Sequence, residues 1–301
     1  GLFVLSGTMG NQVAVLAHTN RGDEVICEAE SHIVYYERAG LSCLAGCQPR
    51  TILGEAGILN AWQVRSAIRP EDLHYPPTGL ICLENTHNRA GGTCYPIEVL
   101  AEISRVGAEF NIPIHMDGAR LFNAAVAQKK KVSEITQYAD SVTFCLSKGL
   151  AAPVGSLLVG SQQFIDKARR YRKMLGGGTR QAGVLAAAGI VALNTMVDRL
   201  EEDHEHARLL AHGLVEMGLS INLATVQTNI VVADVAPLKM TAASFAAALR
   251  ERGVKITQFG ETKVRFVTHY GISKEDVMYT IDAVAKVIAG MDKPPSHHGQ
   301  Y

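Results

Sequence analysis

The sequence contains Ile114-His115-Met116-Asp117-Gly118-Ala119-Arg120 and Phe144-Cys145-Leu146-Ser147-Lys148-Gly149, two stretches that decide the predicted fold. In each stretch a largely apolar run ends at an ionisable residue, Asp117 in the first and Lys148 in the second. Largely apolar runs are typical of strands buried in a parallel sheet. The separation of 31 positions (148 − 117) leaves room for one helical crossover between the strands. We therefore expect Asp117 and Lys148 at the carboxyl edge of one sheet.

Around these stretches, residues 1 to about 175 alternate short apolar runs with amphipathic stretches, a pattern typical of βα units. Seven strands are predicted, at residues 2–5, 24–28, 49–53, 79–83, 112–116, 141–145 and 154–159. Helices are predicted at residues 9–19, 60–68, 95–110, 161–174 and 179–195. The pattern predicts an α/β fold with a mostly parallel seven-stranded sheet flanked by helices.

The character of the sequence changes after residue 197, where a charged helix is predicted at 200–217. The elements predicted beyond it are strands near 219–223, 228–233, 254–258 and 263–267, and helices near 241–252 and 274–290. We therefore predict two domains, a large one at residues 1–197 and a smaller C-terminal α+β domain at residues 198–301.

The composition limits the class of protein. Lys+Arg and Asp+Glu are equal, at 29 each among 301 residues, which argues against binding to nucleic acid or to an anionic membrane. No apolar run approaches the roughly 18 residues of a membrane span. The six cysteines lack the paired spacing of a zinc site, so that reduced thiols and no bound metal are predicted. We expect a protein of the cytoplasm or of an organelle matrix.

Asp117 and Lys148 are the two groups that pyridoxal phosphate (PLP) requires. The lysine amine forms a Schiff base with the cofactor, and the carboxylate pairs with its ring nitrogen. A lysine that ends a buried strand is costly unless it is paired or used. The alternatives are a lysine whose amine reaches solvent and an aspartate that caps a helix. Because one cofactor accounts for both residues, the sequence predicts a PLP site.

Other polar residues suit the same site. Gly7 and Thr8 lie between a predicted strand and a helix, where free backbone N–H groups favour a phosphate, although a plain capped helix start has the same pattern. Arg120 and Arg265 carry the planar group that binds carboxylates, or they form structural salt bridges.

Two of the eleven histidines are candidates for the site. His32 follows an apolar strand and could lie flat against a cofactor ring, whereas His74 precedes Tyr75-Pro76-Pro77 in a loop. Most histidines are polar surface residues or satisfied core residues, and this remains the alternative for both.

Together these segments resemble the low-specificity L-threonine aldolases, a family of fold-type-I, aspartate-aminotransferase-like PLP enzymes. The resemblance covers essentially the whole chain, in family order, and HMDGAR with LSKGL…PVGS carries most of its specificity. The matching stretches are SGTMGNQ at 6–12, ESHIVYYE at 30–37, LENTHN at 83–88, HMDGARLFNAAVA at 115–127, LSKGLAAPVGSLLVG at 146–160, RKMLGGGTRQAG at 172–183 and VRFVTHYGI at 264–272.

The resemblance implies roles for individual residues. Lys148 would be the Schiff-base lysine and Asp117 the partner of the ring nitrogen, while His32 would stack on the ring. His74 would lie near the substrate hydroxyl. The remaining implied roles are phosphate binding by Gly7 and Thr8, carboxylate binding by Arg120 and Arg265, and contact with the phosphate of a neighbouring subunit by Lys173 and Arg180. A homodimer or homotetramer with shared active sites is therefore implied.

The implied reaction is retro-aldol cleavage of L-threonine, L-allo-threonine and related β-hydroxy-α-amino acids to glycine and an aldehyde. His74, His32 and a water molecule are the candidate bases. The alternatives are a β-eliminating PLP lyase and a PLP-binding chain without turnover. The family's N-terminal Arg-Ser-Asp-Thr segment, with its substrate-binding serine, is absent from these 301 residues, so we expect a segment before Gly1 in the native protein. Tyr270-Gly271 also stands where many relatives carry an aspartate.

Overall fold

The computed structural model describes residues 1–291 and divides the chain into two compact units, Gly1–Glu201 and Glu202–Tyr301. The break between the units follows Glu201, four positions after the predicted domain boundary at residue 197. The assignment of two domains stays a prediction.

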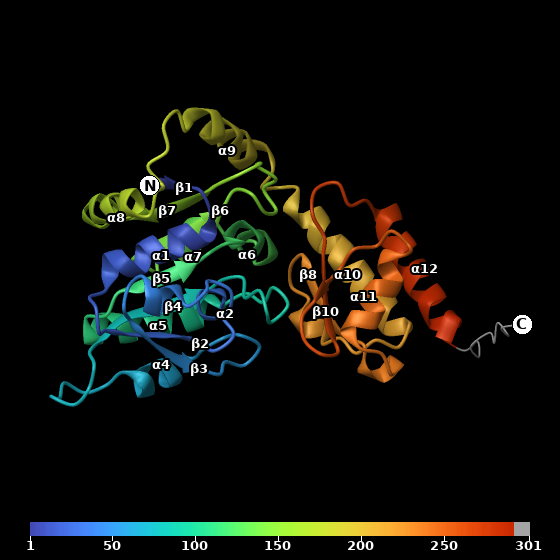
Figure 1. Cartoon of the computed structure of the whole chain (residues 1–301), viewed down its shortest axis with the longest axis horizontal. Helices are drawn as coiled ribbons and strands as arrows, with labels where there is room; N and C mark the ends of the chain where they lie inside the picture. Colours follow the sequence, from blue (N-terminus) through green and yellow to red (C-terminus); the bar gives the residue numbers. More distant parts are fainter. Residues whose placement is uncertain (292–301) are drawn as a thin grey trace, which may run out of the picture. The chain divides into compact units, whose positions relative to one another are not determined.

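The first unit is built on a seven-stranded sheet with the order β1-β7-β6-β5-β4-β2-β3 (Figure 1). From β3 through β2, β4 and β5 to β6 the neighbouring strands are parallel, whereas β7 is antiparallel to both β6 and β1. The predicted α/β class with a mostly parallel sheet is confirmed. The strands are β1 Leu2–Val4, β2 Glu24–Glu28, β3 Gln48–Ile52, β4 Thr78–Glu84, β5 Ile114–Asp117, β6 Ser141–Cys145 and β7 Ser156–Gly160.

Helices cover both faces of this sheet. In β2, Ile26 packs into one core and its neighbours Val25 and Cys27 pack into another, because successive side chains of a strand point to opposite faces. The first core contains α4 (Ala61–Ala67), α5 (Ile97–Phe110), α6 (Leu121–Ala127) and α7 (Val132–Thr136). The opposite face is covered by α1 (Gly7–His18), α2 (His32–Tyr35), α3 (Gly40–Cys43) and α8 (Gln162–Met174).

The sequence pattern missed four helices of the first unit, α2, α3, α6 and α7. Each has only four to seven residues, which is too short to show a 3.6-residue period. Helices this short are stabilised by tertiary packing rather than by their own sequence.

Helix α1 lies very close to the centre of the sheet. A side chain at Gly10 would approach Thr143 of β6, since an added Cβ would lie 2.6 Å from the Thr143 Cγ2 atom. The helix begins at Ser6, whose side-chain oxygen accepts a hydrogen bond from the Met9 N–H. This close packing brings the first turn of α1 to the carboxyl edge of β5 and β6.

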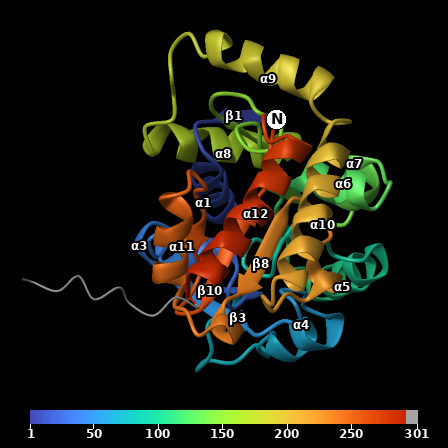
Figure 2. The same ribbon diagram turned by 90° about the vertical axis from the view of Figure 1, so that its right-hand side faces the viewer.

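The second unit holds a three-stranded antiparallel sheet in the order β8-β10-β9, with β8 Ile230–Asp234, β9 Thr257–Gln258 and β10 Lys263–Val267. Three helices share one core with this sheet, α10 (Leu200–Glu216), α11 (Ala242–Arg250) and α12 (Lys274–Met291) (Figure 2).

The strand predicted near 219–223 is wrong. Only Ser220 pairs with Asp234, as an isolated bridge, and a 3-10 helix follows at Leu223–Thr225. The Asn222 side chain accepts a hydrogen bond from the Ala224 N–H, and this local bond turns the backbone away from an extended course.

Within residues 1–291 no single helix is long and apolar enough to cross a membrane. One bent pair, α9 (Gly183–Thr195) with α10, would reach that length and composition when taken together.

Candidate active site

A cavity of about 290 Å³ opens where β5 and β6 end and α1 begins. It is lined by Gly7 and Thr8 of α1, by His32, and by Asp117 and Lys148. Asp117 is the last residue of β5, and Lys148 lies three positions beyond the end of β6. These strands are parallel neighbours, so their carboxyl ends meet at one edge of the sheet. The fold thus brings the two residues that decided the fold prediction into one cavity.

Asp117 is buried and its carboxylate is held on both oxygens. Oδ2 accepts a hydrogen bond from the Asn11 side chain at 2.7 Å, and Oδ1 accepts one from the Ala119 N–H at 3.0 Å. The carboxylate therefore has a defined direction before any ligand binds. It can pair with a cationic or N–H group presented from the cavity.

Lys148 is half-buried, and its amine has no hydrogen-bond or ion-pair partner within the described part of the chain. The backbone is held in a turn by the bond from the Ala151 N–H to the Lys148 carbonyl oxygen, at 2.9 Å. The amine is thus available to an electrophile in the cavity.

The first turn of α1 forms another wall. Gly7 and Thr8 are its first two residues, whose N–H groups have no acceptor inside a helix. An added Cβ at Gly7 would lie 3.0 Å from the Cys145 Sγ atom, so the glycine permits the close approach of the helix end to β6. Free N–H groups, the Thr8 hydroxyl and the positive end of a twelve-residue helix together form a place for an anion.

His32 begins α2 directly after the loop that follows β2. Its Nδ1 atom lies 2.8 Å from Glu37 Oε1, and its backbone N–H donates to Glu84 Oε2 at 2.6 Å. Burial alone would lower the pKa of His32, but the hydrogen bond with Glu37 and the charges of Asp117 and Glu84 outweigh burial and raise that pKa. The imidazole is therefore held in place at the cavity wall by a buried carboxylate.

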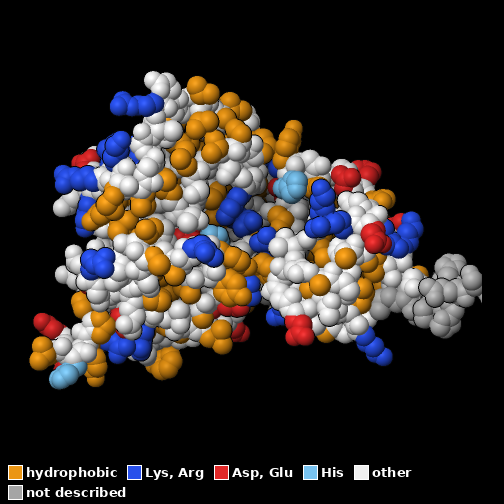
Figure 3. Space-filling view, in the orientation of Figure 1, with side chains coloured by type: hydrophobic (Ala, Val, Ile, Leu, Met, Phe, Trp, Pro, Cys, Tyr) orange, Lys and Arg blue, Asp and Glu red, His pale blue; other side chains and the backbone are white. Residues whose placement is uncertain are grey.

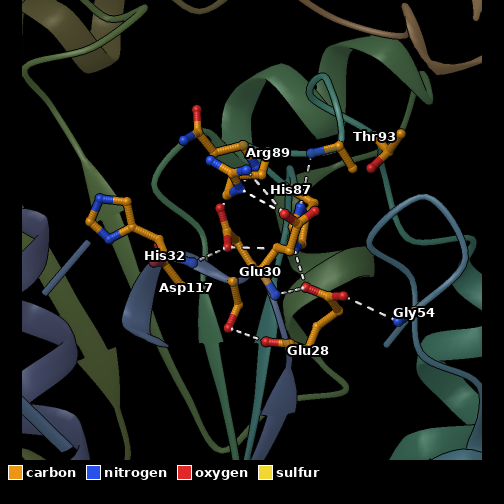
Figure 4. Close-up of polar contacts among 12 residues, drawn as sticks. Glu28, Glu30, His32, Gly54, His87, Arg89, Thr93 and Asp117 are labelled. Atoms are coloured by element: carbon orange, nitrogen blue, oxygen red, sulfur yellow. Dashed lines mark hydrogen bonds and ion pairs between the residues drawn. The ribbon is translucent and has the colours of Figure 1, made fainter. Parts of the chain in front are cut away.

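A buried cluster next to the cavity escaped the sequence analysis. His87 Nε2 lies 2.9 Å from Glu28 Oε2 and 3.9 Å from Glu84 Oε2. Figure 4 shows His87 above Glu28, with the Gly54 N–H donating to Glu28 from the other side. A signal was present, because Glu84 ends the apolar run Leu80–Leu83 just as Asp117 ends its own run. Asn11 and Glu37 were also missed, and they carry no comparable signal.

Five predicted site residues are not among those that line this cavity: His74, Lys173, Arg180, Arg120 and Arg265. The His74 side chain is 81% exposed, and its Nδ1 atom lies 2.8 Å from Asp72 Oδ1. It precedes β4 and so belongs to the amino edge of the parallel strands, opposite the edge that holds Asp117. Lys173, in the last turn of α8, and Arg180, before α9, are both exposed.

The two predicted carboxylate-binding arginines lie in different units. Arg120 precedes α6 and directly follows Ala119, a residue of the cavity wall. Arg265 lies in β10 of the second unit, where its guanidinium stands 4.9 Å from the centre of the Phe259 ring.

The groups around the cavity fit PLP. Lys148 provides an amine without a partner among the described residues, and Asp117 provides a carboxylate whose direction is fixed by two hydrogen bonds. The first turn of α1, at Gly7 and Thr8, provides a helix end for the phosphate. The His32 ring adds a flat surface. These are the chemical groups that a phosphorylated aromatic aldehyde with a basic ring nitrogen requires.

Comparison with known proteins supports this interpretation. The sequence profile of the beta-eliminating lyase family matches residues 1–236. The chain is 46% identical over 292 residues to a probable low-specificity L-threonine aldolase of Arabidopsis thaliana, covering 95% of this chain and 82% of the relative. It is 43% identical over 277 residues to the low specificity L-threonine aldolase of Escherichia coli, covering 92% and 80%.

Solved structures show the same fold. A threonine aldolase from Leishmania major matches with a TM-score of 0.80 at 18% identity, covering 95% of this chain and 83% of that one. An aspartate aminotransferase of Thermus thermophilus matches with a TM-score of 0.71 at 19% identity, covering 95% and 75%. At these identities the likeness concerns the fold alone.

Proposed function

Since the chain belongs to the beta-eliminating lyase family, we propose that it is a PLP-dependent lyase that cleaves L-threonine, L-allo-threonine and related β-hydroxy-α-amino acids to glycine and an aldehyde. One observation carries the proposal: Lys148 and Asp117 line a single cavity together with the first turn of α1. Relatives more than 40% identical to the chain are named L-threonine aldolases, and these names favour this cleavage over other reactions of the lyase family.

In this proposal the Lys148 amine would hold the cofactor at the aldehyde of PLP, and Asp117 would pair with the ring nitrogen. Gly7 and Thr8 would hold the phosphate, and His32 would lie against the ring. When bound, PLP supplies an electron sink that accepts the bonding pair released from the substrate. The protein determines which bond is weakened.

Bond choice is a matter of orientation, and we assign it to Arg120 and Arg265. By gripping the substrate carboxylate they would turn the Cα–Cβ bond perpendicular to the ring plane, the direction in which it is weakened. A base then takes the proton of the β-hydroxyl group. His74, His32 and a water molecule remain the candidates for that base.

We also propose a homodimer or homotetramer with shared sites. Lys173, Arg180 and His74 are exposed and lie outside the cavity of their own chain, so they are free to reach the cavity of a second copy. Hydrophobic side chains gather over α9 in the space-filling view (Figure 3), where Val184, Ile190 and Val191 are each more than 60% exposed. Such a surface is typical of an interface. A location in the cytoplasm stays a prediction.

Product analysis tests the reaction. The PLP-loaded protein is supplied with L-threonine and separately with L-allo-threonine, and acetaldehyde, glycine, 2-oxobutyrate and ammonia are measured. The proposal expects acetaldehyde and glycine in equal amounts. The Lys148→Ala variant serves as the blank, because it retains the cavity but not the attachment amine.

The family name favours a second candidate, a β-eliminating lyase. That reaction would yield 2-oxobutyrate and ammonia from threonine, so the same assay separates the two candidates. A chain that binds PLP without turnover would show reductive labelling of Lys148 and neither pair of products.

A further inference from the structure

Asn11 lies between Asp117, which lines the cavity, and the buried carboxylate of Glu37. It is 1% exposed, and its Nδ2 atom is 2.7 Å from Asp117 Oδ2 and 2.8 Å from Glu37 Oε1. The two N–H bonds of the carboxamide are therefore both used, one on each carboxylate. Without this donor group, carboxylate oxygens within 4.8 Å of each other would face one another in a buried site.

His115 fixes the orientation of the Asn11 carboxamide through the carboxamide oxygen. The Asn11 Oδ1 atom lies 3.2 Å from His115 Nε2. Complete burial, with a further contribution from nearby His18, lowers the pKa of His115 to about 3, so the ring is neutral at ordinary pH. A neutral imidazole has one donor and one acceptor nitrogen. Since Nε2 faces an oxygen, Nε2 carries the proton.

The hydrogen bonds continue from His115 through Ser141 to His18. With Nε2 protonated, His115 Nδ1 is an acceptor, and the Ser141 hydroxyl at 2.9 Å donates to it. The Ser141 oxygen then accepts from His18 Nε2 at 2.7 Å. Burial lowers the pKa of His18 to about 4, so this ring is neutral as well. Donors and acceptors can thus be matched in one direction, from His18 through Ser141 and His115 to the Asn11 oxygen.

Glu37 connects this chain to the imidazole at the cavity wall. Its side chain has no exposed surface, and it accepts hydrogen bonds from Asn11, from Gln12 Nε2 at 2.6 Å and from His32 Nδ1 at 2.8 Å. Among residues 1–291, Asn11 is therefore the one side chain that bonds both Asp117 and the carboxylate that holds His32.

We propose that Asn11 is a positioning residue of the reaction proposed above: its carboxamide holds Asp117 and, through Glu37, His32 in one arrangement, and His115 orients that carboxamide from behind. The inference rests on the proposed function for its kinetic consequences but not for its structural ones. Asn11 is itself one of the lining residues of the cavity, and in this assignment it acts on substrate and cofactor through its two carboxylate partners.

The test compares Asn11→Ala and the milder Asn11→Ser with Asn60→Ala, a control that removes the hydrogen bond from the Gln63 N–H to the Asn60 side chain at the start of α4. We expect Asn11→Ala to keep PLP attached to Lys148, shown by reductive labelling, but to shift the visible absorption band of the bound cofactor. For L-threonine, kcat should fall by roughly tenfold to about 10²-fold, and KM should change less. Asn60→Ala should lower thermal stability and leave both spectrum and kcat unchanged. A wild-type spectrum and kcat in Asn11→Ala and Asn11→Ser would overturn the proposal.

A double variant tests whether His115 acts through Asn11. His115→Phe should lower kcat less than Asn11→Ala does, and adding it to Asn11→Ala should cause no further loss. Independent losses that multiply would contradict the orienting role of His115.

A further measurement uses the cofactor-free wild-type protein, so its result does not depend on whether a variant folds. The ¹⁵N chemical shifts of His115 should report a neutral ring with the proton on Nε2, and a charged ring or an Nδ1–H tautomer would overturn the proposal. If the wild-type protein does not cleave threonine, the proposed function fails, while these shifts and the cofactor spectrum still decide the role of Asn11.

Discussion

The Nδ1 atom of His32 lies 2.8 Å from Oε1 of Glu37, a side chain with no exposed surface. The hydrogen bond between His32 and Glu37 holds a protonatable ring at the wall of the cavity. The charges of Asp117 and Glu84 add to the effect of Glu37, so the raised pKa of His32 is a property of the folded site rather than of the residue.

Replacement of Glu37 should lower the pKa of His32. In Glu37→Gln the hydrogen bond that His32 donates to a charged acceptor is lost, while the burial of the ring, which lowers the pKa, remains. An NMR titration of His32 in the wild-type protein and the variant measures the change. Glu24→Gln is the matched control, because Glu24 is a buried glutamate that pairs with Arg69 at the amino end of β2. An identical His32 titration in Glu37→Gln would contradict this account.

The buried pair of His87 and Glu28 should make stability depend on pH. Burial lowers the pKa of His87, but the charge of Glu84 and the hydrogen bond with Glu28 outweigh it and raise that pKa. The stabilisation that charged His87 provides is fully present below pH 6.5, the ordinary pKa of a histidine, and is lost as pH rises through the raised pKa. Burial raises the pKa of Glu28, but the bond from His87 lowers it overall, so its contribution is lost as pH falls below the ordinary value of 4.5.

The His87→Leu variant should therefore be most destabilised between these values. Removing one partner leaves buried carboxylates uncompensated, which costs roughly 3–5 kcal/mol of unfolding free energy. Urea unfolding at about pH 5.5 and about pH 8.5 checks this, with a smaller difference from the wild type at the higher pH. The exposed His212→Leu replacement should change the unfolding free energy by no more than about 0.5 kcal/mol at either pH. Equal costs of His87→Leu at both pH values would argue against the pair.

Gly10→Ala should destabilise the first unit. The added methyl group would lie 2.6 Å from Thr143 Cγ2, and overpacking of this kind costs roughly 1–3 kcal/mol. Gly183→Ala, in α9, is the matched control, because nothing lies within 4 Å of the added atom. It should be neutral or stabilising by up to about 1 kcal/mol. Thermal unfolding of the two variants measures the contrast, and equal stability would show that α1 can move away from β6.

His74 should affect the reaction without affecting cofactor binding. We expect His74→Phe to lower kcat/KM or to alter the preference between L-threonine and L-allo-threonine, while the visible band of bound PLP persists. The exposure of His74 in its own chain adds a sharper experiment. When Lys148→Ala and His74→Phe chains are mixed, activity should return if each site combines Lys148 of one copy with His74 of another. Mixed oligomers that stay inactive would contradict sharing, and unchanged kinetics of His74→Phe would remove it from the mechanism.

Elements with a strong local signal were predicted well. Short apolar runs between turns identified every strand of the sheet except β3, which was predicted although its sequence Gln48–Ile52 is largely polar. Amphipathic stretches of 13 or more residues identified α5 and α8. The short helices α2, α3, α6 and α7 were missed because they depend on packing. The strand near 219–223 was wrong because a side-chain hydrogen bond of Asn222 competes with pairing.

The sequence by itself determined the α/β fold and the meeting of Asp117 with Lys148, because an apolar run that stops at a charge predicts both a buried strand and its functional edge. Only the tertiary structure joined Asn11, Glu37 and His115 to Asp117 in one hydrogen-bonded network. Their hydrogen bonds join residues up to 106 positions apart, and the direction of those bonds depends on burial, which no local pattern records.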